Sequence, residues 1–198
     1  MRLLHLCTAI LLFTAAGLSS TRATAAPSIV VSVPDQTLVL IDHAAIIARF
    51  PVSTSKFGVG DHSGSYATPL GSLEIASKIG ANAPLGTVFK SRRPTGEILP
   101  PNARGRDPIV TRILWLRGLE KGNARAYSRA IYIHGTPVEK LIGRPASYGC
   151  IRMRSRDVAQ LFSAVNVGTK IAVSNAHLDR ALAQQVLSNP QLSRLATN

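Results

Sequence analysis

Apolar and polar positions alternate along the first part of the chain, where short apolar runs are separated by turn residues. The runs cover residues 28–33, 37–41 and 45–52, with Pro-Asp and Asp-His pairs between them. Alternation with a period of two is typical of β-strands that bury one face, and turn residues between such runs indicate hairpins. This part of the chain therefore predicts an antiparallel meander.

Further strands are predicted from shorter apolar runs over residues 73–77, 113–116, 130–134 and 170–173. Two long segments lack this pattern. Residues 53–71 are rich in Ser, Gly and Thr, which favours loop backbone. Residues 80–108 show little periodicity and carry several prolines in their second half. An irregular segment of that length is usually a functional cover or a mobile loop.

Helical spacing is confined to the C-terminal part of the chain. Ser155 is a plausible N-cap, and apolar side chains then recur at the i, i+3, i+4 and i+7 positions of a buried helix face: Val158, Leu161, Phe162 and Val165. Gly168 is expected to close this helix, and a second helix is predicted over residues 177–195. Without an internal repeat or a linker, the pattern predicts one mainly β domain with a few peripheral α-helices.

The N-terminal segment has the features of a signal peptide. A positive residue, Arg2, precedes an apolar run over residues 3–17, and Ala-Thr-Ala at 23–25 has the small-x-small form of a cleavage site. A retained membrane helix is the alternative, but the run falls short of the ~20 residues that span a bilayer. We expect residues 1–25 to be removed, and an exported protein without a membrane-spanning segment to remain, most plausibly in a periplasm.

These boundaries divide the chain into three parts. The signal peptide covers residues 1–25, the folded domain residues 26–175, and a C-terminal helical tail residues 176–198. The chain has 198 residues, of which 45% are hydrophobic, too many for intrinsic disorder. Two cysteines support neither a disulfide-rich scaffold nor a four-cysteine zinc site.

Charge and cysteine content point to an exported protein with an anionic partner. The formal net charge is +13, and removal of Arg2 and Arg22 with the signal peptide lowers it to +11. Cleavage also removes Cys7 and leaves Cys150 as a single thiol. A lone cysteine in an oxidising compartment either pairs with another chain, lies inert in the core, or is kept because its thiolate reacts.

A histidine precedes this cysteine at a spacing that allows catalysis. His134 ends a predicted strand, and Cys150 follows sixteen positions later in a Ser-x-Gly-Cys turn. An imidazole that accepts the thiol proton would supply the reactive thiolate. Gly149 permits a tight turn, and the amides of Gly149 and Cys150 are candidates for an oxyanion hole. By spacing alone, an unreactive pair is equally compatible with the sequence.

The residues around this pair resemble the L,D-transpeptidase catalytic domain, the family with the YkuD-type fold. The family pattern is an Ile-His-Gly strand end, then Ser/Thr-His-Gly-Cys followed by an apolar residue and commonly Arg-Met. It corresponds here to residues 133–135 and 147–153. Residues 68–73, Thr-Pro-Leu-Gly-Ser-Leu, resemble the strand entry of the family, and the likeness extends over about residues 29–173. The resemblance implies a β sandwich or barrel-like fold.

What the resemblance implies for function is acyl transfer on the stem peptides of peptidoglycan. Cys150 would attack the third stem residue and release the fourth-position D-alanine, and His134 would act as general acid and base. The carbonyl of Gly135 would orient the imidazole. The acyl acceptor is left open between a second stem peptide, a free D-amino acid, a lipoprotein lysine and water, and the oligomeric state is also open.

The sequence departs from the family pattern at Tyr148, which stands where a second histidine is usual. This favours, as an alternative function, a non-catalytic peptidoglycan-binding module. Arg152 is a candidate for holding a substrate carboxylate, or for an ion pair that pins its loop. Ser147 is expected to stabilise the turn, and Tyr132 to pack half-buried or to line the pocket. With scattered histidines, no metal and no organic cofactor are expected.

A basic cluster lies in the irregular segment, within residues 90–106: Lys90, Arg92, Arg93, Arg104 and Arg106. It is expected either to steer the anionic wall polymer and hold stem carboxylates, or to be a solvated mobile loop. Nucleic-acid binding is permitted by the charge. The export signal and the lack of a helix-turn-helix or an aromatic platform motif argue against it. Trp115 is expected in the core, and His62 in a solvated loop.

Overall fold

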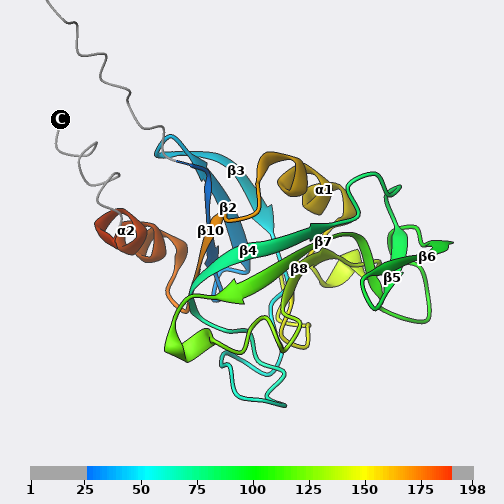
Figure 1. Ribbon diagram of the computed structural model, residues 1–198, viewed down its shortest axis with the longest axis horizontal. Helices are drawn as coiled ribbons and strands as arrows, with labels where there is room; N and C mark the ends of the chain where they lie inside the picture. Colours follow the sequence, from blue (N-terminus) through cyan, green and yellow to red (C-terminus); the bar gives the residue numbers. More distant parts are fainter. Residues whose placement is uncertain (1–25, 189–198) are drawn as a thin grey trace, which may run out of the picture.

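The computed structural model describes residues 26–188 and is built mainly from strands, with two α-helices at the periphery (Figure 1). The elements in chain order are β1 (Ser28–Ser32), β2 (Thr37–Asp42), β3 (Ala45–Pro51), β4 (Gly71–Ile79), β5 (Thr87–Lys90), β6 (Arg93–Ile98), β7 (Ile109–Gly118), η1 (Lys121–Asn123), β8 (Tyr132–Gly135), η2 (Glu139–Leu141), β9 (Ile151–Met153), α1 (Ser155–Ala164), β10 (Lys170–Ser174) and α2 (Leu178–Ser188). The expectation of a mainly β fold with a few peripheral helices is confirmed.

The strands form one continuous sheet with a branch. Its order is β3-β2-β1-β10-β4-β7-β5-β6, and β8 pairs with β7 on one side and with β9 on the other. The antiparallel meander β1-β2-β3 is present as the alternation predicts. Strand β1 also pairs in parallel with β10, so the first and last strands are neighbours in the sheet.

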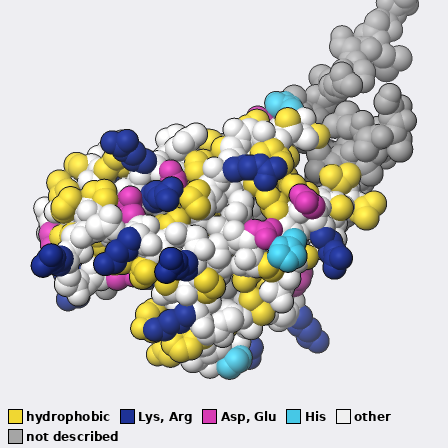
Figure 2. All heavy atoms as spheres, turned by 180° about the vertical axis from the view of Figure 1, so that it is seen from behind, with side chains coloured by type: hydrophobic (Ala, Val, Ile, Leu, Met, Phe, Trp, Pro, Cys, Tyr) yellow, Lys and Arg dark blue, Asp and Glu magenta, His cyan; other side chains and the backbone are white. Residues whose placement is uncertain are grey.

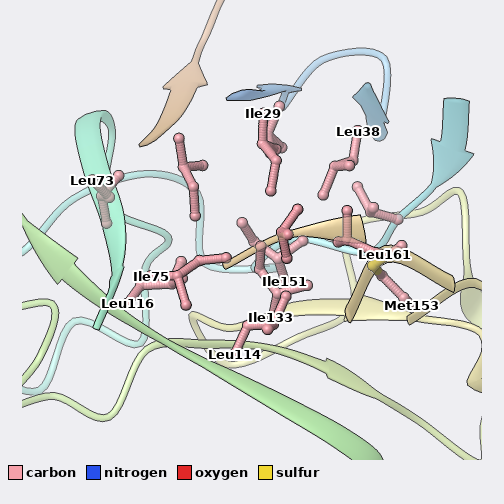
Figure 3. Packing of buried hydrophobic residues seen from close by; sticks show 14 of the residues in the cluster. Ile29, Leu38, Leu73, Ile75, Leu114, Leu116, Ile133, Ile151, Met153 and Leu161 are labelled. Atoms are coloured by element: carbon pink, nitrogen blue, oxygen red, sulfur yellow. The ribbon is translucent and has the colours of Figure 1, made fainter. Parts of the chain in front are cut away.

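The interior is filled by aliphatic side chains from both branches of the sheet and from α1. Figure 3 shows side chains from distant parts of the chain pointing into the same space: Ile29, Leu38, Leu73, Leu116, Ile133, Ile151 and Leu161, among others. Each of these side chains is almost fully buried. Burial of one such side chain contributes about 1.5–3 kcal/mol relative to leaving it exposed.

Strand β1 is buried along its whole length because both of its faces are covered. Ile29 and Val31 face the main core, whereas Val30 packs with Leu178 and Ala181 of α2 on the opposite face. The continuous apolar run at the start of the predicted domain reflects this two-sided burial. Helix α2 thus packs on the sheet. The predicted helix over 189–195 and the signal peptide lie outside the described residues.

Helix α1 buries Val158, Leu161 and Phe162, and the fourth position that the spacing indicates, Val165, is buried at its C-cap. Its N-terminus differs from the expectation, because Arg154 rather than Ser155 occupies the N-cap position. The backbone N–H of Ser155 instead donates to the carboxylate of Glu139, at 2.8 Å. A carboxylate from a neighbouring turn thereby supplies the acceptor that a serine cap would provide.

The segment 80–108, expected to be irregular, contains the hairpin β5–β6. Its tight turn places Ser91 and Arg92 at φ values of 49° and 66°. Hairpin turns with two left-handed residues normally carry Asn or Gly, so the sequence gives no turn signal here.

Among residues 26–188, no helix is long and apolar enough to span a membrane.

Candidate active site

The two candidate catalytic residues are positioned by neighbouring strands. Strands β8 and β9 pair in parallel, with Ile133 opposite Ile151 and His134 opposite Arg152. Cys150 immediately precedes β9, so it lies beside Tyr132 and two positions along from His134. The spacing and rise of β-strands put the Cα atoms of Cys150 and His134 about 8 Å apart. The sheet therefore places the two residues near each other, as the spacing in the sequence allows.

Both side chains point away from the main core. Ile131, Ile133 and Ile151 belong to the core, so the alternate positions, including Tyr132, face the other side of the sheet. There Cys150 packs against a second apolar cluster that contains Tyr132 and Trp115. Trp115, expected in the core, is only partly buried, and its ring stacks on Tyr127 at 4.1 Å between centroids.

The thiol of Cys150 is held by backbone groups. The N–H of Tyr132 donates to Sγ at 3.4 Å, and the thiol donates to the carbonyl of Ala130 at 3.5 Å. Burial raises the pKa of the thiol to about 11, although the Tyr132 amide and the charge of Arg129 act in the opposite direction. The thiol is therefore protonated at neutral pH in the resting site.

The imidazole of His134 is buried and held in one tautomer. Its Nδ1 lies 2.8 Å from the carbonyl oxygen of Gly135. Because a carbonyl only accepts, Nδ1 carries the hydrogen and Nε2 keeps a free lone pair. Burial lowers the pKa of His134 to about 4, so the ring is neutral at neutral pH. The site rests as a neutral thiol and a neutral base.

Gly135 is required by the close approach of β7. A bulge in β7 interrupts its pairing with β8 between Val110 and Ile113. A Cβ atom at Gly135 would lie 2.6 Å from the carbonyl oxygen of Val110 and 3.1 Å from Cβ of Thr111. Bulges next to active sites commonly re-aim a side chain. Here the bulge and the glycine together fix the carbonyl that holds His134.

The turn before Cys150 is stabilised by Ser147. Its hydroxyl donates to the carbonyl of Cys150 at 2.5 Å and accepts the N–H of Gly149 at 3.2 Å. Gly149 has φ of 114°, and a Cβ there would lie 3.1 Å from Cδ1 of Ile131. Thr68 donates to the carbonyl of Gly149, which ties the turn to the neighbouring loop.

These contacts bear on the expected oxyanion hole, which stays a prediction. The N–H of Gly149 is already used by Ser147, so it does not point to a substrate in this conformation. The N–H of Cys150, in contrast, makes no hydrogen bond within the part of the chain that the structure describes. Of the two amides named from the sequence, only the Cys150 amide is free to stabilise an oxyanion.

Arg152 lies across from His134 but is engaged within the protein. The side chain is 5% exposed, and its guanidinium pairs with Asp107 and contacts the hydroxyl of Ser53. Asp107 also accepts a hydrogen bond from Thr136. These contacts match the alternative of an ion pair that pins the loop, whereas the binding of a substrate carboxylate by Arg152 stays a prediction. The buried Nε atom has no hydrogen-bond partner among residues 26–188.

The two tyrosines of the motif lie in different environments. Tyr132 is buried, with 5% of its surface exposed, and its hydroxyl accepts a hydrogen bond from Arg92 at 3.3 Å. Tyr148 is 60% exposed, and its hydroxyl accepts a hydrogen bond from Lys56 at 3.0 Å. Tyr148 therefore points to solvent beside the site, where the usual histidine would stand in the family pattern.

Of the basic cluster, Arg92 reaches the site. Its guanidinium lies 4.5 Å from the centre of the Trp115 ring as well as beside Tyr132, in the cluster that contains Cys150. Arg106 instead pairs with Glu97 on the hairpin. Sequence reasoning missed Arg129, whose side chain is largely buried and pairs with Asp61 at 2.8 Å. No motif marked it, because its partner lies 68 positions away.

Comparison with known proteins identifies the family. The model of the YkuD family, described as the L,D-transpeptidase catalytic domain, matches residues 26–173. The chain belongs to the L,D-transpeptidase catalytic-domain family. The expectation drawn from the His-Gly and Ser-x-Gly-Cys motifs is thus confirmed.

Sequence relatives of this L,D-transpeptidase domain match over shorter segments. The chain is 31% identical over 87 residues to the probable L,D-transpeptidase YcfS of Escherichia coli (strain K12), covering 37% of this chain and 27% of that protein. It is 39% identical over 80 residues to the putative L,D-transpeptidase YkuD of Bacillus licheniformis, covering 40% and 48%. The matched segments thus span less than half of these relatives' lengths.

A solved structure supports the same fold. The L,D-transpeptidase from Xylanimonas cellulosilytica superposes with a TM-score of 0.50 at 15% identity, covering 77% of this chain and 62% of that one.

Among residues 26–188, no group of three or more His, Cys, Asp or Glu side chains is placed to hold a metal ion. The expectation of catalysis without a metal or cofactor stays a prediction.

Proposed function

We propose that the chain is a peptidoglycan L,D-transpeptidase that works through a Cys150 thioester. The observation that supports this most strongly is the neutral imidazole of His134, locked by the Gly135 carbonyl with Nε2 free, on the sheet face that carries Cys150. A neutral imidazole can accept the proton of the thiol as Sγ attacks, so this pair can carry out nucleophilic acyl transfer.

In the first half-reaction, Sγ attacks the carbonyl carbon of the third stem residue while its proton passes to Nε2 of His134. The Cys150 N–H stabilises the oxyanion of the tetrahedral intermediate. The intermediate collapses with cleavage of the bond to the fourth-position D-alanine, whose nitrogen takes the proton from His134. A thioester and free D-alanine result.

In the second half-reaction, the acceptor amine attacks the thioester carbonyl and gives its proton to Nε2. Collapse re-forms the Cys150 thiol, which takes that proton, and leaves a new amide. The same histidine acts as base and then as acid in each half. Water in place of the amine would give a carboxypeptidase side activity. To identify the acyl acceptor, each candidate amine is supplied in turn and the product is analysed by mass spectrometry.

The remaining residues of the motif serve as support. Ser147 and Gly149 hold the turn that presents the nucleophile, and Tyr132 contributes the amide that contacts Sγ. Arg152 anchors Asp107 and thereby the loop at the entrance to β7. Each is a positioning role that pre-organises the reacting atoms.

Arg92 is placed to hold a carboxylate of the donor stem. It reaches the cluster around Cys150 from the hairpin turn, and it has no ion pair with a carboxylate in the described part of the chain. A guanidinium forms two parallel hydrogen bonds to a carboxylate. The other basic side chains of the segment 90–106 would add long-range attraction to the anionic wall.

For an enzyme of this kind, residues 1–25 would act as an export signal, and the working compartment would be the periplasm. Residues 26–175 would form the catalytic unit, and residues 176–198 would extend it with the helix that packs on β1. N-terminal sequencing of the exported protein tests the cleavage after Ala25.

A carbapenem tests the nucleophile directly. The protein is incubated with the drug, and its intact mass is recorded. We expect a covalent adduct that disappears in Cys150→Ala and forms more slowly in His134→Ala. An unmodified mass in the wild-type protein, together with binding to isolated peptidoglycan, would instead support the non-catalytic wall-binding module.

That second candidate is favoured by one observation. Tyr148 replaces the usual histidine and is exposed next to the site, where it can contact a wall polymer without taking part in proton transfer. The adduct experiment separates the two candidates, because binding alone does not require a reactive thiol.

A further inference from the structure

Three aromatic side chains gather on the surface next to the candidate active site. Phe57, Tyr66 and Tyr148 are 50%, 56% and 60% exposed, and their ring centres lie 5.4–5.9 Å from one another. We call these three residues the aromatic platform. Large exposed aromatic side chains that lie together mark binding surfaces more often than single exposed side chains do.

A hydrogen bond and short β-bridges hold the backbone that carries the platform. The hydroxyl of Ser55 donates to the carbonyl of Tyr66 at 2.5 Å, and short bridges join Val59 to Thr68 and Ser55 to Ser147. Tyr66 has φ of 52°, a left-handed conformation that is strained for a bulky residue. Strain of this kind persists where the surroundings enforce it and is common at binding sites.

A polar pocket adjoins the rings. Its volume is about 460 Å³, and its lining includes Tyr66, Tyr148, Ser63, Ser128 and Arg125. A ligand that fits here needs an apolar face for the rings and a rim of hydrogen-bonding groups for the hydroxyls and the guanidinium. The ring faces already attract positive charge, since Nζ of Lys56 lies 4.5 Å from the centre of Tyr148.

We propose that the aromatic platform and its pocket bind the N-acetylated glycan strand to which the donor stem is attached. A pyranose ring has a C–H face that packs on aromatic rings, and a rim of hydroxyl and acetamido groups. This inference rests on the proposed function, because it takes the stem peptide as the substrate of Cys150.

The length of the stem fits this placement. Three extended residues separate the attacked carbonyl from the sugar and span about 10 Å. Tyr148 lies two residues before Cys150, so their Cα atoms are at most about 7 Å apart. The rings of Phe57 and Tyr66 lie a further 5.4 and 5.9 Å from that of Tyr148. The platform therefore lies within reach of a sugar whose stem extends to Cys150.

Binding is tested without catalysis. A peptide-free tetrasaccharide of alternating N-acetylglucosamine and N-acetylmuramic acid is titrated into the full chain, and binding is followed by NMR. We expect saturable binding that weakens at least fivefold in the double variant Phe57→Leu/Tyr66→Asn. Leucine keeps apolar surface without a ring, and asparagine suits the left-handed backbone at position 66.

Matched variants separate ring stacking from general effects. Phe57→Tyr keeps the ring and should bind as the wild type does, and Val167→Ala, at a 61% exposed apolar position elsewhere, should also leave binding unchanged. Absence of binding in the wild type, or equal binding in the double variant, overturns the proposal. So does loss of a concentration-dependent dimer in that variant, because the platform would then be an interface between two copies.

Kinetics distinguish this inference from the proposed function. D-Alanine release is measured with a bare tetrapeptide and with the same tetrapeptide on its disaccharide. We expect kcat/KM to favour the disaccharide donor by about tenfold in the wild type and by less than twofold in the double variant, with the bare peptide unchanged. Equal turnover of both donors by the wild type overturns the platform but not the transpeptidase. Release from neither donor overturns the transpeptidase, and the glycan titration still decides the platform.

Discussion

The chemistry of the site depends on how single residues are buried. Cys150 and His134 both lie where a charge is costly, and burial shifts their pKa values in opposite directions, to about 11 and about 4. A thiolate–imidazolium pair is therefore disfavoured before substrate binds. In the proposed mechanism, proton transfer accompanies the attack, so the thiol is unreactive in the resting state. In an oxidising compartment this protects the nucleophile.

Alkylation of the thiol tests this resting state. Iodoacetamide reacts with the thiolate, so the reaction with Cys150 at pH 7 should be slower than with a free cysteine of pKa about 8.5, by a factor on the order of a hundred. The rate should rise up to about pH 11, where the Cys150 thiol ionises. It is followed by mass spectrometry of the chain without residues 1–25, where Cys150 is the single cysteine. A rate that levels off near pH 7 would contradict the neutral pair.

Gly135→Ala tests the carbonyl that holds the imidazole. The added Cβ meets the carbonyl oxygen of Val110, so the backbone must shift, and the hydrogen bond to Nδ1 of His134 is lost or lengthened. We expect activity to fall at least tenfold and stability to fall by about 1–3 kcal/mol. Gly122→Ala is the control, because its Cβ would meet no atom within 4 Å. Similar losses in both variants would show that the effect is not specific to Gly135.

At the scale of elements, the site is made by two short strands and the segments that hold them. Strand β8 carries His134 and the turn before β9 carries Cys150, the two residues proposed to react. The β7 bulge lies against Gly135, and the turn of the hairpin β5–β6 places Arg92 beside Tyr132. The strained turn at Ser91 and Arg92 lacks the glycine that would relieve it. This is the pattern expected where a side chain is kept for its function at a cost in stability.

Replacing the two residues of that turn separates the cost in stability from the function of Arg92. Ser91→Asn/Arg92→Gly installs the sequence that this hairpin turn prefers, and it should stabilise the protein by up to about 1 kcal/mol. Loss of the guanidinium beside Tyr132 should lower kcat/KM for a donor with a free carboxylate by about tenfold. Ser91→Asn alone keeps Arg92 and should retain activity. Full activity in the double variant would remove Arg92 from the binding of the donor.

The sequence predicts these elements unevenly. The meander, the strand that carries His134 and the buried face of α1 follow from local periodicity, and the motif identifies Cys150 and His134. The hairpin β5–β6 is missed because Ser91 and Arg92 carry no turn signal. The contacts of Arg152 with Asp107 and of Arg129 with Asp61 join residues far apart in the chain, so no local pattern reveals them. The role of the Gly149 amide depends on a hydrogen bond to Ser147 that only the folded turn shows.

At the scale of the whole molecule, the positive charges are spread over the surface, whereas the hydrophobic core is continuous. Figure 2 shows Lys and Arg side chains spread over one face of the protein rather than gathered in a single patch. Such a surface attracts an extended anionic polymer without a preferred groove. The core, in contrast, connects the meander to the strands of the site through shared side chains. The charges that would attract a polymer thus lie on the surface, whereas the side chains that hold the strands of the candidate site lie in the core.

The buried ion pair between Arg129 and Asp61 fastens the loop 53–71 to the segment before β8. Asp61 also accepts the backbone N–H of Arg125. Asp61→Asn leaves a buried guanidinium without its counter-charge, so we expect a loss of about 3–5 kcal/mol and a Tm lower by about 10 °C. The comparison is Glu97→Gln, which breaks the exposed pair with Arg106 and should cost less than about 1 kcal/mol. An equal effect of the two variants in thermal unfolding would contradict the structural role of Asp61.

The parallel pairing of β1 with β10 has a consequence for folding during synthesis. Residues 28–32 find their partner only when residues 170–174 have been made. At the usual rate of synthesis, that interval is on the order of ten seconds. During this time β1, which is buried along its whole length in the folded protein, lacks one neighbour, so the nascent chain cannot complete its central sheet. The nascent chain therefore stays open to binding by chaperones until β10 has emerged from the ribosome.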